Sequence, residues 1–263
     1  MAPHVRSVLI ASGGLALILA VGFYLQLDWV TGMWPWPTSR LSNIFIASIL
    51  AASGVPVLWI ALSGEAAAIT AGAIDFGLMY SGMTAFSLQV YADSGREAIL
   101  IYAAMCAALA VFCIATALRT RQVPFRDNRP LPMGVWASFV VFVLLLTVIG
   151  TVLLLHKANV FPWPLDPQQS VLYGWIFLGA ACYFLYALLK PVWSNAQGQL
   201  LGFLAYDLVL IVPFVGHFPT VRADLRMNLI VYTSVLIYSG LLATYYLFIN
   251  RATRFGRVLQ SQT

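Results

Sequence analysis

Long runs of apolar residues, separated by short polar stretches, extend along almost the whole chain. Each run has about the 20 residues that a helix needs to cross the hydrocarbon core of a bilayer, or somewhat more. None shows the alternation of period two that is typical of a membrane β-strand. The runs cover residues 7–27, 41–62, 66–92, 99–118, 133–156, 171–189, 200–218 and 229–250. We therefore predict eight transmembrane helices joined by short loops.

The composition agrees with a membrane location. Hydrophobic residues make up 61% of the 263 residues and charged residues only 9%, and the mean hydropathy is +0.87. A typical soluble domain carries about 25% charged residues, so the composition excludes a water-soluble fold. The formal net charge is +5, but in a membrane protein basic residues set the orientation and contact lipid headgroups. We expect membrane lipids as partners and no nucleic acid.

Lysine and arginine are more frequent on one side of the predicted membrane domain than on the other. If the N-terminus is cytoplasmic, nine basic residues share the cytoplasmic side: Arg6, Arg119, Arg121, Arg126, Arg129, Lys190, Arg251, Arg254 and Arg257. Five lie on the opposite side: Arg40, Arg96, Lys157, Arg222 and Arg226. The positive-inside rule favours this orientation. We predict a multi-pass protein of the cytoplasmic (inner) membrane with both termini in the cytoplasm.

A tryptophan-proline motif occurs twice, each time in a loop on the predicted extracytoplasmic side. Residues 33–37 read MWPWP and residues 160–164 read VFPWP, so that Trp34 corresponds to Phe161 and Trp36 to Trp163. Tryptophan prefers the headgroup level of a membrane, and proline interrupts helices. We expect Trp34, Trp36 and Trp163 at the extracytoplasmic rim, either as interfacial anchors or as a wall over a cavity between the two halves.

Further residue pairs recur at nearly the same spacing, about half the length of the chain, and indicate an internal duplication. These pairs are Asp75 and Asp207, Asp93 and Asp224, and Tyr102 and Tyr232. Each unit contains four helices, an even number, so both units enter the membrane in the same direction. We predict an all-α polytopic membrane protein with two parallel four-helix repeats, 1–129 and 130–263, related by a pseudo-two-fold axis along the membrane normal.

Asp75 and Asp207 are expected near the middle of the third and seventh helices. An aspartate at the centre of a membrane helix costs roughly 2.5–3.5 kcal/mol on insertion scales, so both side chains are expected to face the protein interior. No lysine, arginine or histidine occurs at the same depth of any apolar run. Each acid is a candidate proton or cation site or, alternatively, a protonated group that hydrogen bonds a neighbouring helix. The last run supplies candidate partners for Asp207 through its hydroxyl groups: Tyr232, Thr233, Ser234, Tyr238, Ser239, Thr244, Tyr245 and Tyr246.

His156 and His217 are expected near the extracytoplasmic face. Two histidines at similar depth are candidate ligands of haem iron or copper, and histidine is also an ordinary residue at membrane interfaces. Cys106, Cys113 and Cys182 lie inside apolar runs without zinc spacing, so we interpret them as packing residues. The chain has no GxSxG, Walker, HExxH or CxxC motif, so we predict no catalytic residue and no metal-ligand set.

Three classes of function are compatible with the sequence. The first is a transporter-like carrier of a small solute or lipid, with a midplane site at Asp75, Asp207 and Tyr232, and the duplication and matched acids favour it. The second is a non-catalytic subunit or assembly factor of a larger membrane complex, which the short loops and few polar residues favour. The third is a haem- or metal-binding membrane oxidoreductase that uses His156 and His217.

Overall fold

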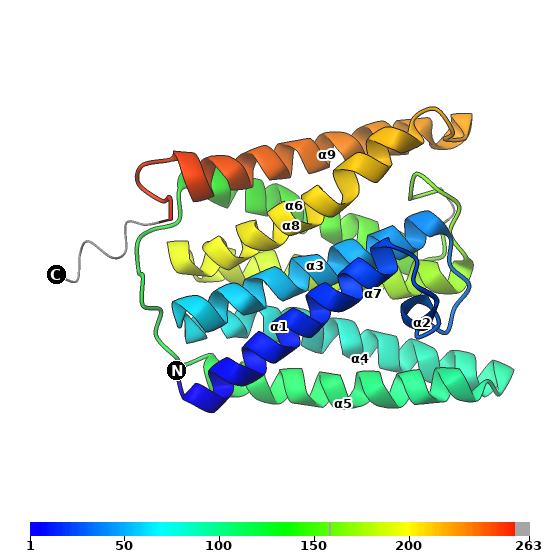
Figure 1. Ribbon diagram of the computed structural model, residues 1–263, viewed down its shortest axis with the longest axis horizontal. Helices are drawn as coiled ribbons and strands as arrows, with labels where there is room; N and C mark the ends of the chain where they lie inside the picture. Colours follow the sequence, from blue (N-terminus) through cyan, green and yellow to red (C-terminus); the bar gives the residue numbers. More distant parts are fainter. Residues whose placement is uncertain (158, 256–263) are drawn as a thin grey trace.

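The computed structural model describes residues 1–157 and 159–255 (Figure 1). Arg257, assigned above to the cytoplasmic side, lies outside these residues. The fold is all-helical, with 79% helix, and the described residues form no β-strand. Within them, eight long helices are α1 Pro3–Tyr24, α3 Arg40–Ser63, α4 Ile69–Ser94, α5 Glu97–Thr120, α6 Met133–Leu154, α7 Pro167–Leu189, α8 Trp193–His217 and α9 Arg226–Thr244. The short elements are α2 Asp28–Thr31, the 3-10 turns Ala66–Ala68 and Ala223–Leu225, and the π-helical turn Tyr245–Ile249 that extends α9.

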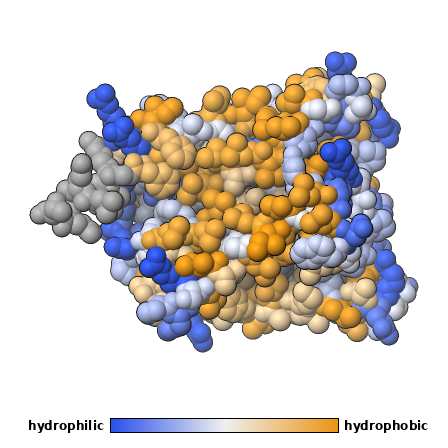
Figure 2. Space-filling view, in the orientation of Figure 1, coloured by the Kyte–Doolittle hydropathy of each residue, from blue (hydrophilic) through white to orange (hydrophobic). Residues whose placement is uncertain are grey.

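Seven helical segments of the structure are long and apolar enough to cross a membrane. Figure 2 shows a broad band of hydrophobic side chains between two hydrophilic ends, which is the surface expected of a protein surrounded by lipid. The prediction of an all-helical integral membrane protein is confirmed at this level. The helix outside the set of seven is α4, whose 26 residues include many glycine, serine and threonine residues as well as Asp75.

Several helices begin earlier than the apolar runs predicted, and α7 and α8 show why. α7 begins at Pro167 because the Asp166 side chain caps it, accepting the N–H groups of Gln168 at 2.9 Å and Gln169 at 3.3 Å. α8 begins at Trp193, well before the predicted start at residue 200. Its first two turns carry polar residues that are nonetheless buried: Ser194, Asn195, Gln197 and Gln199. Hydropathy alone does not reveal a helix whose polar turns are covered by neighbouring elements.

The long helices pack as antiparallel neighbours and across two further interfaces. Neighbouring pairs are α1 with α3, α4 with α5, α6 with α7, and α8 with α9. In addition α3 packs on α8, and α4 packs on α7. α4 and α6 both contact α7 but scarcely contact each other, and the same holds for α1 and α8 on α3. The beginning of α1 and the end of α9 lie at one end of the molecule, at the left of Figure 1.

Two of these pairs cross at glycines. A Cβ atom on Gly13 of α1 would lie 3.0 Å from the carbonyl oxygen of Gly54 on α3, and one on Gly54 would lie 2.9 Å from the Gly13 oxygen. Gly150 of α6 and Gly174 of α7 show the same distances of 3.0 and 2.9 Å. Small residues at both positions let the two backbones approach closely, as is common between membrane helices.

A linker of residues 121–132 joins α5 to α6 at the end of the molecule where α1 begins and α9 ends (Figure 1). The buried Glu65 carboxylate accepts the Arg126 N–H at 3.1 and 3.3 Å, and Ser194 donates to the Asp127 carbonyl oxygen at 2.9 Å. The linker is therefore attached both to the turn before α4 and to the start of α8. Burial raises the pKa of Glu65, although hydrogen bonds from the Arg126 and Asp127 backbone oppose this effect.

Candidate functional site

The two tryptophan-proline loops lie at the opposite end of the molecule, and each bonds to the other half of the chain. The Trp36 indole N–H donates to Gln168 Oε1 on α7 at 3.0 Å. The Trp163 indole N–H donates to Ser42 Oγ on α3 at 3.0 Å. Both tryptophans are only 3% exposed. These two indoles therefore belong to the packed interior, where each one holds the first turn of a helix from the other half.

An aromatic cluster fills the space between α3 and α7 below these loops. The ring of Phe45 lies 4.6 Å from that of Tyr173 and 5.1 Å from that of Phe161, measured between centroids. We call this group the aromatic seam, and its members are Phe45, Phe161, Trp163, Tyr173, Phe177, Phe214 and Tyr232. Trp34 is partly buried, and its ring centroid lies 5.6 Å from that of Trp36 and 5.7 Å from that of Tyr102.

Asp207 on α8 is buried and faces α9. Its Oδ1 accepts a hydrogen bond from Ser239 at 3.0 Å, whereas Oδ2 has no partner among the described residues. Ser239 is one of the eight hydroxyl-bearing residues expected from the sequence to supply such a bond. Tyr232, which the sequence suggested for the midplane site, instead hydrogen bonds the hydroxyl of Tyr206, the neighbour of Asp207 in the chain.

Asp75 on α4 faces α7. A Cβ atom on Gly179 of α7 would overlap the Asp75 carboxylate and would lie 2.8 Å from the Asp75 carbonyl oxygen. The side chain is partly buried and forms no hydrogen bond or ion pair within residues 1–157 and 159–255. The two aspartates thus lie in different settings. Asp75 is at a contact between the first and second halves of the chain, and Asp207 is inside the second half.

The two histidines also have separate environments. His217 bonds the Pro162 carbonyl oxygen through Nε2 at 3.2 Å and the Thr220 hydroxyl through Nδ1 at 2.9 Å. His156 is exposed at the end of α6 and has a left-handed φ of 53°. Among the described residues, no group of three or more His, Cys, Asp and Glu side chains is arranged to hold a metal ion. The three cysteines are free.

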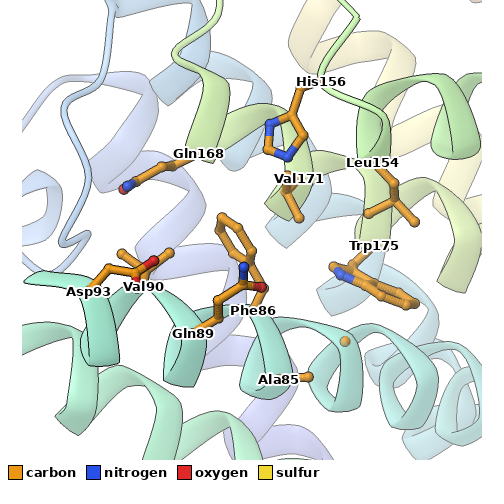
Figure 3. Close-up of a pocket in the computed structure, with 11 residues that line it drawn as sticks. Ala85, Phe86, Gln89, Val90, Asp93, Leu154, His156, Gln168, Val171 and Trp175 are labelled. Carbon is orange, nitrogen blue, oxygen red and sulfur yellow. The ribbon is translucent and has the colours of Figure 1, made fainter.

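An open groove of about 480 Å³ lies between α4 and the α6–α7 region (Figure 3). We call it the α4–α7 groove. Its lining is Gly82, Ala85, Phe86, Gln89, Val90, Asp93, Leu154, His156, Gln168, Val171 and Trp175. Among these residues, the sequence indicated only His156 as a candidate site residue, and it indicated Asp93 only as a member of a repeated pair. The others come from segments that are distant in sequence, and no short motif brings them together.

These observations define the class of protein: an all-helical integral membrane protein with buried acids and a groove on its side. No family model, curated protein or solved structure matches the chain. The geometry of the molecule is therefore the only guide to its function.

Proposed function

We propose that the protein is a membrane carrier built from two related halves, 1–129 and 130–263, that move against each other around Asp75. The observation that carries the proposal is the Asp75 carboxylate, which has no partner among the described residues and lies at the contact between α4 of the first half and α7 of the second. In carriers made of repeats, substrate and coupling ions bind near the bilayer midplane at the interface of the repeats. An ionisable group in this position is a functional candidate by its cost alone.

The pattern of helix contacts supports a relation between the halves. If α1, α3, α4 and α5 correspond to α6, α7, α8 and α9, the contacts correspond as well. The pair α1 and α3 then matches α6 and α7, and the pair α4 and α5 matches α8 and α9. Under the same correspondence, the contact of α3 with α8 becomes the contact of α7 with α4, and the reverse also holds. A two-fold axis between the halves produces this exchange.

Aromatic contacts give similar support. Trp34 lies 5.7 Å from Tyr102, and the residues paired with them by sequence, Phe161 and Tyr232, lie 5.9 Å apart. In each case a loop residue before the second helix of a half packs against the fourth helix. This correspondence uses two of the residue pairs that the nearly constant sequence spacing had matched.

The ends of α1 and α6 also correspond. Gln26 and His156 each follow their helix in a left-handed conformation, with φ of 58° and 53°. The Leu27 N–H donates to the Gly22 carbonyl oxygen at 2.9 Å. The Lys157 N–H donates to the equivalent carbonyl oxygen of α6 at 3.3 Å. The glycine crossings correspond less regularly. The number of residues between Gly13 of α1 and Gly150 of α6 is larger than the number between Gly54 of α3 and Gly174 of α7. The halves therefore differ in the depth at which their first two helices cross.

Cysteine accessibility tests the carrier without knowledge of its substrate. Met79 lies one turn after Asp75 on the same contact with α7 and is buried. In a protein whose three cysteines are replaced by alanine, Met79→Cys should react with a membrane-impermeant maleimide in right-side-out vesicles and also in inside-out vesicles. Leu78→Cys, which is 36% exposed on the lipid-facing side of α4, should react from neither side. Reaction of Met79→Cys from one side only, or from neither, would contradict the proposal.

The aromatic seam favours a second candidate, a non-catalytic subunit or assembly factor, because a scaffold needs no path through its centre. Gentle detergent extraction tests it, since a subunit should copurify with partners in fixed stoichiometry, and a lone monodisperse protein would contradict this role. A haem or copper role would require His217 to give up one of its two hydrogen bonds, because one ring nitrogen would bind the metal. An absorption spectrum and metal analysis of the purified protein test that third role.

A further inference from the structure

The α4–α7 groove follows from the helix packing. α4 and α6 both pack on α7 and scarcely contact each other, so α7 forms the floor between two walls. At the inner end the Trp175 indole lies over Gly82, where a Cβ atom would overlap the ring. Glycine at this position therefore makes room for the indole, and the indole closes the groove toward the middle of the molecule.

The groove changes in character along its length. Gln89, Asp93 and Gln168 lie toward the end of the molecule that holds the tryptophan loops, and Ala85 and Trp175 lie toward the other end of the groove (Figure 3). Asp93 follows Gly82 on α4 by about three turns, which corresponds to roughly 16 Å of helix. This is about half the thickness of a bilayer core, which is roughly 30 Å. The groove therefore offers polar groups at the interface and apolar groups to the depth of one leaflet.

The lining carries one charged side chain, that of Asp93, and the Arg96 guanidinium lies beside the lining, where it donates to Gln168 Oε1 at 3.4 Å. Asp93 is the one acidic residue of the lining, is exposed, and forms no ion pair within the described part of the chain. Its sequence counterpart Asp224 is paired with Arg222 at 2.9 Å. Gln89 and His156 also line the groove and add hydrogen-bonding groups. A ligand headgroup with a positive charge and hydrogen-bond donors complements this arrangement.

We propose that the α4–α7 groove binds a lipid whose headgroup carries an ammonium group. The ammonium group lies at Asp93, and one hydrocarbon chain extends past Ala85 toward Trp175. The volume of about 480 Å³ is within the range of ligand sites. As the substrate class of the carrier this inference rests on the proposed function, whereas binding itself is measured without transport.

Lipid binding to the purified, detergent-solubilised protein tests the proposal by native mass spectrometry. The probes are phosphatidylethanolamine and phosphatidylglycerol with identical chains. The protein should bind phosphatidylethanolamine more tightly, by up to about fivefold for one partly exposed charge pair. Asp93→Asn should remove this preference, and Asp224→Asn should leave it unchanged. Asp93 is exposed, so its substitution tests the headgroup contact without disturbing the core.

A pair of tryptophan substitutions on α4 tests the place of binding. Ala85→Trp fills the groove and should reduce the binding of both lipids at least tenfold, whereas Leu88→Trp, outside the lining and 47% exposed, should not. Unchanged binding in Ala85→Trp, or an unchanged preference in Asp93→Asn, would overturn the inference. Intact binding together with one-sided labelling of Met79→Cys would refute the carrier alone. Two-sided labelling with no groove binding would refute only the lipid.

Discussion

Asp207 holds one carboxylate oxygen 3.0 Å from the hydroxyl of Ser239, while its other oxygen has no partner among the described residues. In hydrocarbon an unsatisfied polar atom has no water to replace a missing bond. The Ser239 hydrogen bond is therefore a polar contact between α8 and α9 in addition to the bond between the Tyr206 and Tyr232 hydroxyls.

Replacing Ser239 with alanine should destabilise the protein by about 1–2 kcal/mol, because the buried carboxyl group then loses its remaining partner. Thermal unfolding in detergent measures the change. Ser234→Ala is the matched control, since the Ser234 hydroxyl is exposed and donates only to the Ile230 carbonyl oxygen of its own helix. Equal effects of the two substitutions would show that the Asp207 contact contributes nothing.

Single residues also show what the sequence can and cannot predict. The cost of a charged group in lipid indicated that Asp207 faces inward, and it is 5% exposed. The same reasoning left eight hydroxyl groups as candidate partners. Choosing Ser239 over Tyr232 requires the rotation of α9 about its axis, which is set by packing against α8 and is not encoded in any local motif.

At the scale of helices, the glycine crossings fix how closely neighbouring elements approach. Gly13 and Gly14 are adjacent on α1, yet only Gly13 faces another helix, and a Cβ atom on Gly14 would meet no atom within 4 Å. The sequence shows both glycines but not which one lies in the contact.

Gly13→Ala should therefore destabilise the protein by about 1–3 kcal/mol, because the new methyl group forces α1 away from α3. Gly14→Ala should be neutral or slightly stabilising, since alanine is the better helix former. The midpoint of thermal unfolding of each variant checks this prediction. A Gly13→Ala protein as stable as Gly14→Ala would mean that the crossing tolerates separation.

The attachment of the 121–132 linker to Glu65 makes the stability of the protein depend on pH. The fold raises the pKa of Glu65, mainly through burial, and so favours its protonated form. The stabilising contribution is fully present below the unfolded pKa of about 4.3 and is lost as pH rises through the folded pKa. Glu65→Gln is uncharged at every pH, so its stability relative to the wild type should rise between pH 4 and pH 8.

Asp127 provides a control of opposite sign for this measurement. Partial burial alone would raise its pKa, but side-chain and backbone hydrogen bonds from Arg129 outweigh this effect and lower it. Its contribution is present above the unfolded pKa and is lost as pH falls through the folded value. Asp127→Asn should therefore lose stability relative to the wild type as pH rises from 3 toward 5. Parallel pH profiles for the Glu65 and Asp127 variants would refute the assignment.

At the scale of the whole molecule, we predict that the end where α1 begins and α9 ends is cytoplasmic. In the background without cysteines, Ser94→Cys and Gln122→Cys place exposed thiols at the two opposite ends. An impermeant maleimide added to intact cells should label Ser94→Cys and not Gln122→Cys, and disrupted cells should show labelling of both. The reverse pattern in intact cells would invert the orientation derived from the basic residues.

Much of the architecture could be predicted because the membrane imposes it. The apolar runs gave the helices and their order, since backbone groups in lipid have few alternatives to a helix. The groove could not be predicted, because it depends on α4 and α6 standing apart on α7. In the sequence, Trp175 is simply one of the apolar residues of its run. Its position at the inner end of the groove depends on Gly82, which lies in the other half of the chain.

The indoles of Trp36 and Trp163 have one more consequence. Each indole lies in one half of the chain and donates a hydrogen bond to a residue of the other half. Both hydrogen bonds must therefore break if the halves separate at this end. If only one of these hydrogen bonds broke, the other would still join the halves, and the halves would tilt relative to each other. The halves should therefore separate at this end in a single step, without a long-lived, partly open intermediate.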